Sequence, residues 1–331
     1  MHPVVLISLV LLGVVALIEI VARAVATTIS IPIFERRPAL NARSDDPVDH
    51  AEPITLRTVD GVRIAASLIP RRDESRPARG LVVFLPEFGG SRWSANYYAA
   101  GPLEAGYDVL AFDFRNHGDS EHVDGYEPSH WVGIAEIRDA DAAIDEALRR
   151  AEPCGLPVVL LGISRGASTS LISTARHRDV AAVVAECPPS VDPMMLHYAV
   201  KWAELYVPKW FARAIPEWHM AQTMRIVRHV ASWRRGSRIV PVERSLRHIG
   251  PRPCLMISGQ KDTYIPGELI ETMCGLVGPS CERWDVPRAR HNLARLVGEA
   301  EYDRRIVAFC DQVGLPDEEP VTIPIEAAVR V

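Results

Sequence analysis

The chain has 331 residues, of which 48% are hydrophobic, and it carries a formal net charge of −5 at pH 7. This length suits one α/β domain with an insertion, or one domain with a membrane anchor. The negative net charge argues against a general nucleic-acid-binding protein, because such proteins are usually basic.

The first apolar segment, residues 3–22, is interrupted only by Ser8, Gly13 and Glu19. About 20 helical residues span roughly 30 Å, which is the thickness of the hydrocarbon core of a bilayer. The segment therefore predicts a transmembrane anchor within residues 1–34. A cleavable signal peptide is the alternative, with the small residues at 24–26 as its cleavage site. A buried core helix is the third reading.

Basic residues distinguish these alternatives. No Lys or Arg precedes the apolar segment, so the basic region that begins a signal peptide is missing. The basic residues that follow it are Arg23, Arg36, Arg37 and Arg43. By the positive-inside rule, a retained anchor would place the rest of the chain in the cytoplasm. A cleaved signal would instead make the protein secreted or periplasmic.

Strand and helix patterns alternate after a polar linker, which is expected over residues 35–52. Two β-rich runs, residues 53–59 and 62–70, meet at Asp60-Gly61, which is a strong hairpin signal. Further strands are expected over residues 81–85, 108–112, 157–161, 180–185, 253–258 and 282–286. Helices are expected over residues 94–104, 133–150, 165–176, 267–276 and 293–313. This alternation predicts an α/β fold with a mostly parallel sheet flanked by helices, formed by residues 53–189 and 250–315. A C-terminal tail, residues 316–331, follows.

The segment 190–249 is too long and too aromatic for a simple crossover. Its large apolar residues are Trp202, Tyr206, Trp210, Phe211, Trp218, Met220, Met224 and Trp233. We interpret the segment as a helical cap insertion, in which most aromatic side chains pack the insertion onto the domain. Its second half also contains Arg225, Arg228, Arg234, Arg235 and Arg238. These arginines would form either a solvated surface or a patch that faces anionic lipid headgroups.

Six cysteines are dispersed along the chain, at Cys154, Cys187, Cys254, Cys274, Cys281 and Cys310. The absence of a C-x-x-C pair from the sequence argues against a zinc or thioredoxin-type site. Cys274 and Cys281 are close enough in sequence to pair, but the scattered usage favours unpaired thiols in a reducing compartment. We expect neither a metal ion nor an organic cofactor.

Residues 162–166, with the sequence Gly-Ile-Ser-Arg-Gly, lie between an expected strand and an expected helix. A serine at such a turn, flanked by glycines two residues away, is the pattern of a nucleophile elbow. The glycines are needed because the turn is sharp. The pattern alone occurs by chance in roughly one chain in ten of this length. The assignment of Ser164 therefore depends on the rest of the chain supplying a base and an acid.

A serine hydroxyl needs a base within hydrogen-bond reach, and the base needs an orienting acid. On a parallel sheet, such groups lie in loops at the carboxyl ends of the strands. Asp262 follows the strand expected at 253–258, and His291 follows the strand expected at 282–286. The order Ser164, Asp262, His291 is that of the α/β-hydrolases. A turn or helix-cap role is the alternative for Asp262, and a solvated loop position is the alternative for His291.

Taken with these motifs, residues 53–313 resemble α/β-hydrolase-fold serine hydrolases, and in particular the branch that includes monoglyceride lipases and serine aminopeptidases. Residues 111–120 resemble the D-x-R-G-x-G-x-S segment of that family. The resemblance implies that Asp113, Arg115 and Ser120 shape the loop next to the site. His117, in the same loop, precedes the nucleophile and is not expected to be the base.

The resemblance also implies a structural role for Glu186, which matches a common acidic position of the family. Its alternative role is to replace Asp262 as the orienting acid.

An oxyanion hole needs two backbone N–H donors aimed at the developing negative charge. The N–H of Arg165 is one candidate, because it directly follows the nucleophile at a helix N-terminus. The resemblance implies that Phe88 supplies the second. This chain has Pro86-Glu87 where the family usually has His-Gly. Either the Glu87 side chain points away and pairs with an arginine, Arg92 or Arg165, or the enzyme is unusual.

These residues predict a serine hydrolase that cleaves a carboxylic ester through an acyl-enzyme. The apolar insertion and the expected anchor favour a small acyl-ester or lipid-like substrate near a membrane. Two alternatives stay open. One is an aminopeptidase or amidase with the same triad, and the other is a non-catalytic, membrane-tethered binding protein with this fold.

Overall fold

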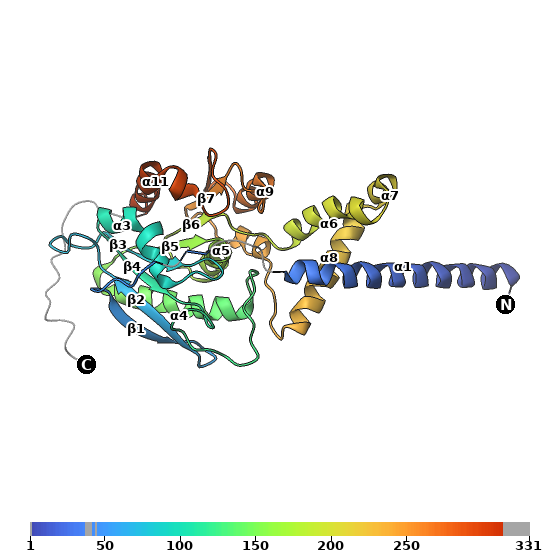
Figure 1. Ribbon diagram of the computed structural model, residues 1–331, viewed down its shortest axis with the longest axis horizontal. Coiled ribbons are helices and arrows are strands. Elements are labelled where there is room, and N and C mark those ends of the chain that lie inside the picture. The colour runs from blue at the N-terminus through green and yellow to red at the C-terminus, as the bar shows by residue number, and fades with distance from the viewer. Residues whose placement is uncertain (1, 37–41, 44, 314–331) are drawn as a thin grey trace. The chain divides into compact units, whose positions relative to one another are not determined.

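The computed structural model describes residues 2–36, 42–43 and 45–313. The chain forms two compact units (Figure 1). One, the helical unit, contains the N-terminal helix and residues 192–239, and the other, the sheet unit, contains the rest. The expected C-terminal tail, residues 316–331, lies outside the described residues, as does Arg37.

The sheet unit is built on eight strands in the order β1-β2-β4-β3-β5-β6-β7-β8. Their bounds are β1 (Glu52–Arg57), β2 (Arg63–Ile69), β3 (Gly80–Leu85), β4 (Tyr107–Phe112), β5 (Val158–Ile163), β6 (Ala182–Glu186), β7 (Cys254–Gly259) and β8 (Cys281–Val286). The hairpin β1–β2 and the pair β2–β4 are antiparallel, and every pair from β4 to β8 is parallel. The predicted α/β fold with a mostly parallel sheet is confirmed.

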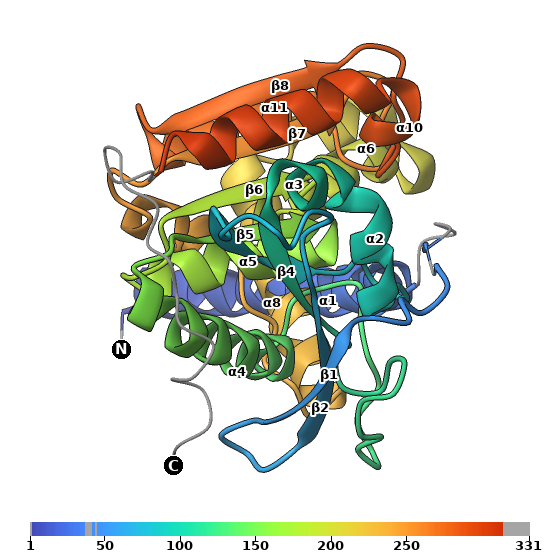
Figure 2. The same cartoon turned by 90° about the vertical axis from the view of Figure 1, so that its left-hand side faces the viewer.

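Helices cover both faces of the sheet (Figure 2). The helices on one face are α2 (Ala95–Tyr98), α3 (Ala100–Ala105) and α11 (Glu299–Asp311), and those on the other are α4 (Ile134–Ala151), α5 (Arg165–Arg176) and α9 (Gly267–Val277). The short elements are η1 (Arg92–Ser94), η2 (Glu152–Cys154), η3 (Val242–Arg244), η4 (Leu246–His248) and α10 (Ala294–Val297). Because both faces are covered, β3, β5, β6 and β7 are buried along their whole length and consist mostly of apolar residues.

The loop after β4 is shaped by buried charges. The Asp113 carboxylate accepts hydrogen bonds from the backbone N–H and the guanidinium of Arg92. The Ser120 hydroxyl donates to the Asp113 carbonyl and accepts from the backbone of β2. Arg115 forms ion pairs with Asp139 and Asp60. These contacts are those of a structural loop.

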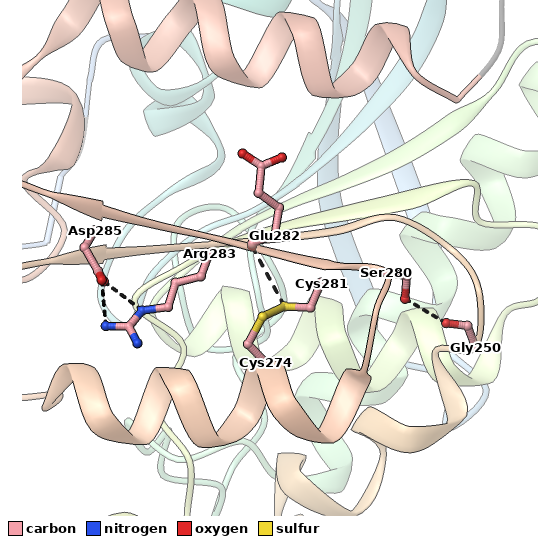
Figure 3. Close-up of a disulfide and its surroundings, with 7 residues drawn as sticks. All are labelled: Gly250, Cys274, Ser280, Cys281, Glu282, Arg283 and Asp285. Carbon is pink, nitrogen blue, oxygen red and sulfur yellow. Dashed lines mark hydrogen bonds and ion pairs between the residues drawn. A yellow bond between two sulfur atoms is a disulfide. The ribbon is translucent and has the colours of Figure 1, made fainter.

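A disulfide joins Cys274, in the last turn of α9, to Cys281, the first residue of β8 (Figure 3). The prediction of unpaired thiols was therefore wrong for this pair. The turn between α9 and β8 reverses the chain within a few residues and brings the two Cα atoms to 5.5 Å, which is typical of disulfides. The other cysteines, Cys154, Cys187, Cys254 and Cys310, are free.

The helical unit contains α1 (Pro3–Glu35), α6 (Asp192–Tyr206), α7 (Lys209–Ala214) and α8 (Glu217–Arg234). Helix α1 continues well beyond the predicted apolar segment, and its second half contacts α8. Glu19 pairs with His219 at 2.7 Å, and Arg23 donates to Thr223 at 3.3 Å. The first half of α1 exposes its apolar side chains.

Two expectations about the insertion hold only in part in the helical unit, where Arg225, Arg234 and Arg238 are exposed as a solvated surface requires. Arg228 belongs to neither a solvated surface nor a lipid-facing patch, because it is buried and its Nε lies 2.7 Å from Asp192. Trp210, Trp218 and Trp233 are exposed, whereas packing was expected for most of the aromatic residues.

Glu186 connects β6 to the helices that follow β8. Its carboxylate is fully buried and accepts hydrogen bonds from the Tyr302 hydroxyl at 2.7 Å and the Ala294 N–H at 3.2 Å. Because burial disfavours the charged form, the pKa of Glu186 is raised from 4.5 to about 7.

This raised pKa predicts that folding stability falls as pH rises. The folded state still holds the Glu186 proton between about pH 4.5 and 7, where the unfolded chain has released it. Raising the pH from 5 to 8 should therefore remove up to about 3 kcal/mol of wild-type stability. The variant Glu186→Gln cannot titrate at this position, so its folding stability should fall less over the same pH range. Urea unfolding of both proteins at the two pH values tests this, and equal losses would contradict it.

Candidate active site

Ser164 lies in a strained turn between β5 and α5. Its φ of 52° and ψ of −115° are unusual for a residue with a side chain. A Cβ atom on Gly162 would overlap the backbone of Gly166, and one on Gly166 would overlap the carbonyl of Leu85. Both positions therefore require glycine. Strain of this kind concentrates at functional sites.

The structure brings Ser164, His291 and Asp262 together in one chain of hydrogen bonds. The Oγ of Ser164 lies 3.0 Å from Nε2 of His291, and Nδ1 of His291 lies 2.8 Å from Oδ2 of Asp262. The three residues follow β5, β8 and β7, so they meet at the carboxyl ends of parallel strands. Ser164 and His291 are buried. With Nδ1–H donating to Asp262, Nε2 is free to accept the serine proton, a tautomer assigned from the hydrogen bonds.

Asp262 combines the orienting position with the turn role that was its alternative. Its second oxygen, Oδ1, accepts hydrogen bonds from the backbone N–H groups of Tyr264 at 2.8 Å and Ile265 at 2.9 Å. The turn therefore holds the carboxylate in place while Oδ2 faces the imidazole. The Tyr264 ring packs edge-on against His291, with ring centroids 5.1 Å apart.

The elements that carry the two expected oxyanion donors lie against each other. The close approach of Gly166 to Leu85 packs the first turn of α5 on the end of β3, directly before the loop that contains Phe88. The Arg165 side chain is fully buried and donates to the Ser129 carbonyl at 3.0 Å. Its guanidinium carbon lies 5.1 Å from the centre of the Phe88 ring. Donation by these two N–H groups stays a prediction.

Glu87 does not pair with the side chain of either arginine proposed for it. Arg92 binds Asp113 and Asp119, and the carboxylate nearest to Arg165 is Glu136, at 3.5 Å. The Glu87 carboxylate instead accepts the backbone N–H of Arg43 at 2.7 Å. Sequence reasoning missed this partner because any residue at position 43 except proline offers the same N–H.

Two other side chains flank the site. The His117 ring packs edge-on against Phe88, with centroids 5.9 Å apart. The sulfur of Cys187 and the side-chain ligand atoms of Asp262 and His291 all lie within 4.8 Å of one another. Such a group could hold a metal ion, but burial raises the pKa of the Cys187 thiol and disfavours the thiolate that a metal requires. The hydrogen bond between Asp262 and His291 also already occupies a potential ligand atom on each.

Comparisons with known proteins agree with this fold. Residues 82–311 match the model of the alpha/beta hydrolase family. An esterase of Pyrococcus furiosus superposes with a TM-score of 0.60 at 24% identity, covering 84% of this chain and 98% of its own. An esterase of Exiguobacterium antarcticum superposes with a TM-score of 0.51 at 17% identity, covering 78% of this chain and 98% of its own.

A third similar structure is described as a membrane phospholipase A and a bacterial virulence factor. It has a TM-score of 0.52 and 16% identity, and the match covers 94% of this chain and 97% of that protein. At these identities the structural matches establish the fold alone. A search of curated proteins found no match.

The packing of α5 on β3 predicts the effect of a single methyl group. The substitution Gly166→Ala would place Cβ inside the Leu85 carbonyl, so the turn or the loop must shift, at a cost of about 1–3 kcal/mol. Gly275→Ala is the matched control, because this position in α9 has nothing within 4 Å. It should be neutral or stabilising by up to about 1 kcal/mol. Urea unfolding measures both, and equal stabilities would contradict the packing argument.

Proposed function

Because the chain belongs to the alpha/beta hydrolase family, we propose that it is a serine hydrolase that cleaves a carboxylic ester through an acyl-enzyme. The observation that carries the proposal is the buried hydrogen-bond chain from Ser164 through His291 to Asp262, with distances of 3.0 and 2.8 Å. Nucleophile, base and orienting acid stand in the order that this reaction requires.

In the proposed reaction the Oγ of Ser164 attacks the ester carbonyl while Nε2 of His291 takes its proton. The negative charge that forms on the carbonyl oxygen is stabilised by the N–H groups of Phe88 and Arg165. Asp262 stabilises the imidazolium, which then protonates the departing alkoxide. Water, activated by the same imidazole, attacks the acyl-enzyme and releases the carboxylic acid with the serine regenerated.

For the substrate we propose a small acyl ester or a lipid-like ester at a membrane surface. Helix α1 is long and apolar enough to cross a membrane, which would hold the site near lipids. The similar structures include proteins described as esterases and one described as a membrane phospholipase A. Their descriptions support the ester class and leave the acyl chain and the leaving group open.

We further propose that α1 is a retained anchor. A signal peptidase cut at residues 24–26 would fall inside a continuous helix, Pro3–Glu35. It would also separate Glu19 and Arg23 from their partners on α8, His219 and Thr223. Signal peptides have no reason to make such contacts with the mature protein, so the contacts favour the anchor.

Two observations bear on which side of the membrane the sheet unit lies, and they point to opposite sides. Arg36 and Arg43 follow α1, and by the positive-inside rule they favour a cytoplasmic location for the sheet unit. The disulfide between Cys274 and Cys281 is typical of an oxidising compartment. We propose the cytoplasmic orientation on the basis of the arginines that follow α1.

The proposed chemistry predicts that Ser164 reacts with a fluorophosphonate probe and that Ser164→Ala does not. Hydrolysis of p-nitrophenyl esters should fall by about 10³-fold or more in the variant, because the nucleophile is lost. Gel fluorescence and initial rates measure the two effects. Folded wild-type protein that neither reacts nor hydrolyses esters would instead favour the non-catalytic binding protein.

The amidase alternative is resolved in the same experiment by aminoacyl anilides. The ester proposal expects faster turnover of p-nitrophenyl esters than of anilides. Because both reactions use the same triad, only the substrate preference separates them. A preference for anilides would support the aminopeptidase alternative.

The anchor predicts that the intact N-terminus stays on the protein and that the protein sediments with membranes. Intact mass of the purified protein and fractionation of cells measure these two properties. Deletion of residues 1–18 should release the protein into the soluble fraction while keeping the contacts of Glu19. A mature protein that begins near residue 27 would contradict the anchor. For the orientation, the free thiol of Cys154 should react in intact cells with a membrane-permeable maleimide and not with an impermeable one.

A further inference from the structure

The segment that follows α1 is docked on the sheet unit at the loop that carries an expected oxyanion donor. We call Ala42, Arg43 and Asp45, the described residues of this segment, the strap. The backbone N–H of Arg43 donates to Oε1 of Glu87 at 2.7 Å, and the carbonyl of Arg43 accepts the Ser94 hydroxyl at 2.7 Å. Arg43 is thus held by both of its backbone polar groups.

Side chains add to this attachment. The guanidinium of Arg43 lies 3.6 Å above the centre of the Tyr97 ring, a distance typical of a cation–π contact. Its Nε also donates to Asp45 at 2.7 Å. The chain beyond the strap continues along the sheet unit, where Val48 and Ala51 pack against the hydrophobic core. The strap is therefore part of a docked segment, although the sequence predicted a polar linker here.

The partners that the described structure shows for the strap outside the strap itself lie on one short stretch of chain. Glu87 directly precedes Phe88, and Ser94 and Tyr97 belong to η1 and α2, which follow the same loop. The Cβ of Ala42 lies 3.4 Å from the position that a Cβ on Gly89 would occupy. The strap therefore spans the loop on both sides of Phe88.

The conformation of Glu87 depends on the strap. Only 2% of its surface is exposed, and among the described residues its Oε2 has no hydrogen-bond partner. The carboxyl group fills the space beside Gly90, where a Cβ would lie 2.9 Å from it. The backbone N–H of Arg43 is thus the donor from another residue that satisfies this carboxyl group in the described structure. Without it, a buried carboxyl group would be left unsatisfied, and such groups are costly.

We propose that Glu87 is a positioning residue, which clamps the strap onto the oxyanion loop and thereby holds the N–H of Phe88 in its catalytic position. This rests on the proposed ester hydrolysis, since it assigns Phe88 a role only in that reaction. Without the clamp, the Glu87 side chain would turn toward water and carry the neighbouring Phe88 with it. In the sequence, residues 36–41 separate the end of α1 from the strap, so a short stretch of chain connects the anchor to the segment that holds the oxyanion loop.

The test uses four single substitutions in the full-length protein, in detergent micelles. Glu87→Ala and Arg43→Pro each remove one partner of the hydrogen bond. Glu87→Gln keeps an acceptor oxygen, and Arg43→Ala keeps the donor while removing the guanidinium. The first pair therefore breaks the clamp, and the second pair is its matched control.

We expect both clamp-breaking variants to lower kcat for p-nitrophenyl butyrate about tenfold or more, since small displacements of catalytic groups have such effects. KM should change less than about threefold, because the loss is in transition-state stabilisation. Glu87→Gln should restore kcat to within about threefold of wild type. A purely structural role for Glu87 would lower the fraction of active protein, measured by fluorophosphonate titration, without lowering kcat per active site.

Hydrogen exchange of the backbone amides in residues 87–91 provides a readout that needs no activity. The amide of Gly90, which donates to the Glu87 carbonyl at 3.0 Å, should exchange faster in the clamp-breaking pair than in the controls. Unchanged exchange and kcat in that pair would overturn the clamp while leaving ester hydrolysis intact. If the wild type proves inactive, the proposed function fails. The hydrogen-exchange comparison then still tests the clamp: faster exchange in the clamp-breaking pair supports it, and unchanged exchange overturns it.

Discussion

The close packing of α5 on the end of β3 is the constraint on which the rest of the site depends. No side chain fits at Gly166, because the Leu85 carbonyl occupies that space. The contact forces the sharp turn in which Ser164 has a positive φ, and it aligns the start of α5 with the loop after β3. One steric contact therefore sets the nucleophile and both expected oxyanion donors relative to each other. His291 and Asp262 then need only loops of ordinary length at the neighbouring strands.

Much of this arrangement could be predicted because it depends on chain order and periodicity. Apolar runs of strand length alternate with amphipathic helices, which determines a parallel sheet and the edge at which its loops meet. The pairing of Ser164, His291 and Asp262 follows from that edge, and the structure places their atoms at hydrogen-bond distances. Their catalytic roles stay predictions, because geometry alone does not demonstrate a reaction.

The remaining features depend on contacts that leave no trace in residue patterns. The Arg43 amide that binds Glu87 is a backbone group, so the residue type at position 43 does not predict this contact. The link between Cys274 and Cys281 depends on how tightly the chain turns between α9 and β8, which composition does not reveal. The contacts of α1 are similar: hydropathy predicts an apolar helix, whereas its contacts with α8, such as that between Glu19 and His219, are seen only in the structure.

The carboxylate beside the oxyanion loop is the main objection that the sequence raises to ester hydrolysis, and the structure answers it electrostatically. Burial raises the pKa of Glu87 more strongly than its backbone hydrogen bonds lower it, so its charged form is less favoured than that of an exposed glutamate. Arg165 carries a permanent positive charge, fully buried and beside the Phe88 ring. The surroundings of Phe88 are therefore less negative than the residues Pro86-Glu87 suggest, and they are compatible with a developing negative charge on the substrate.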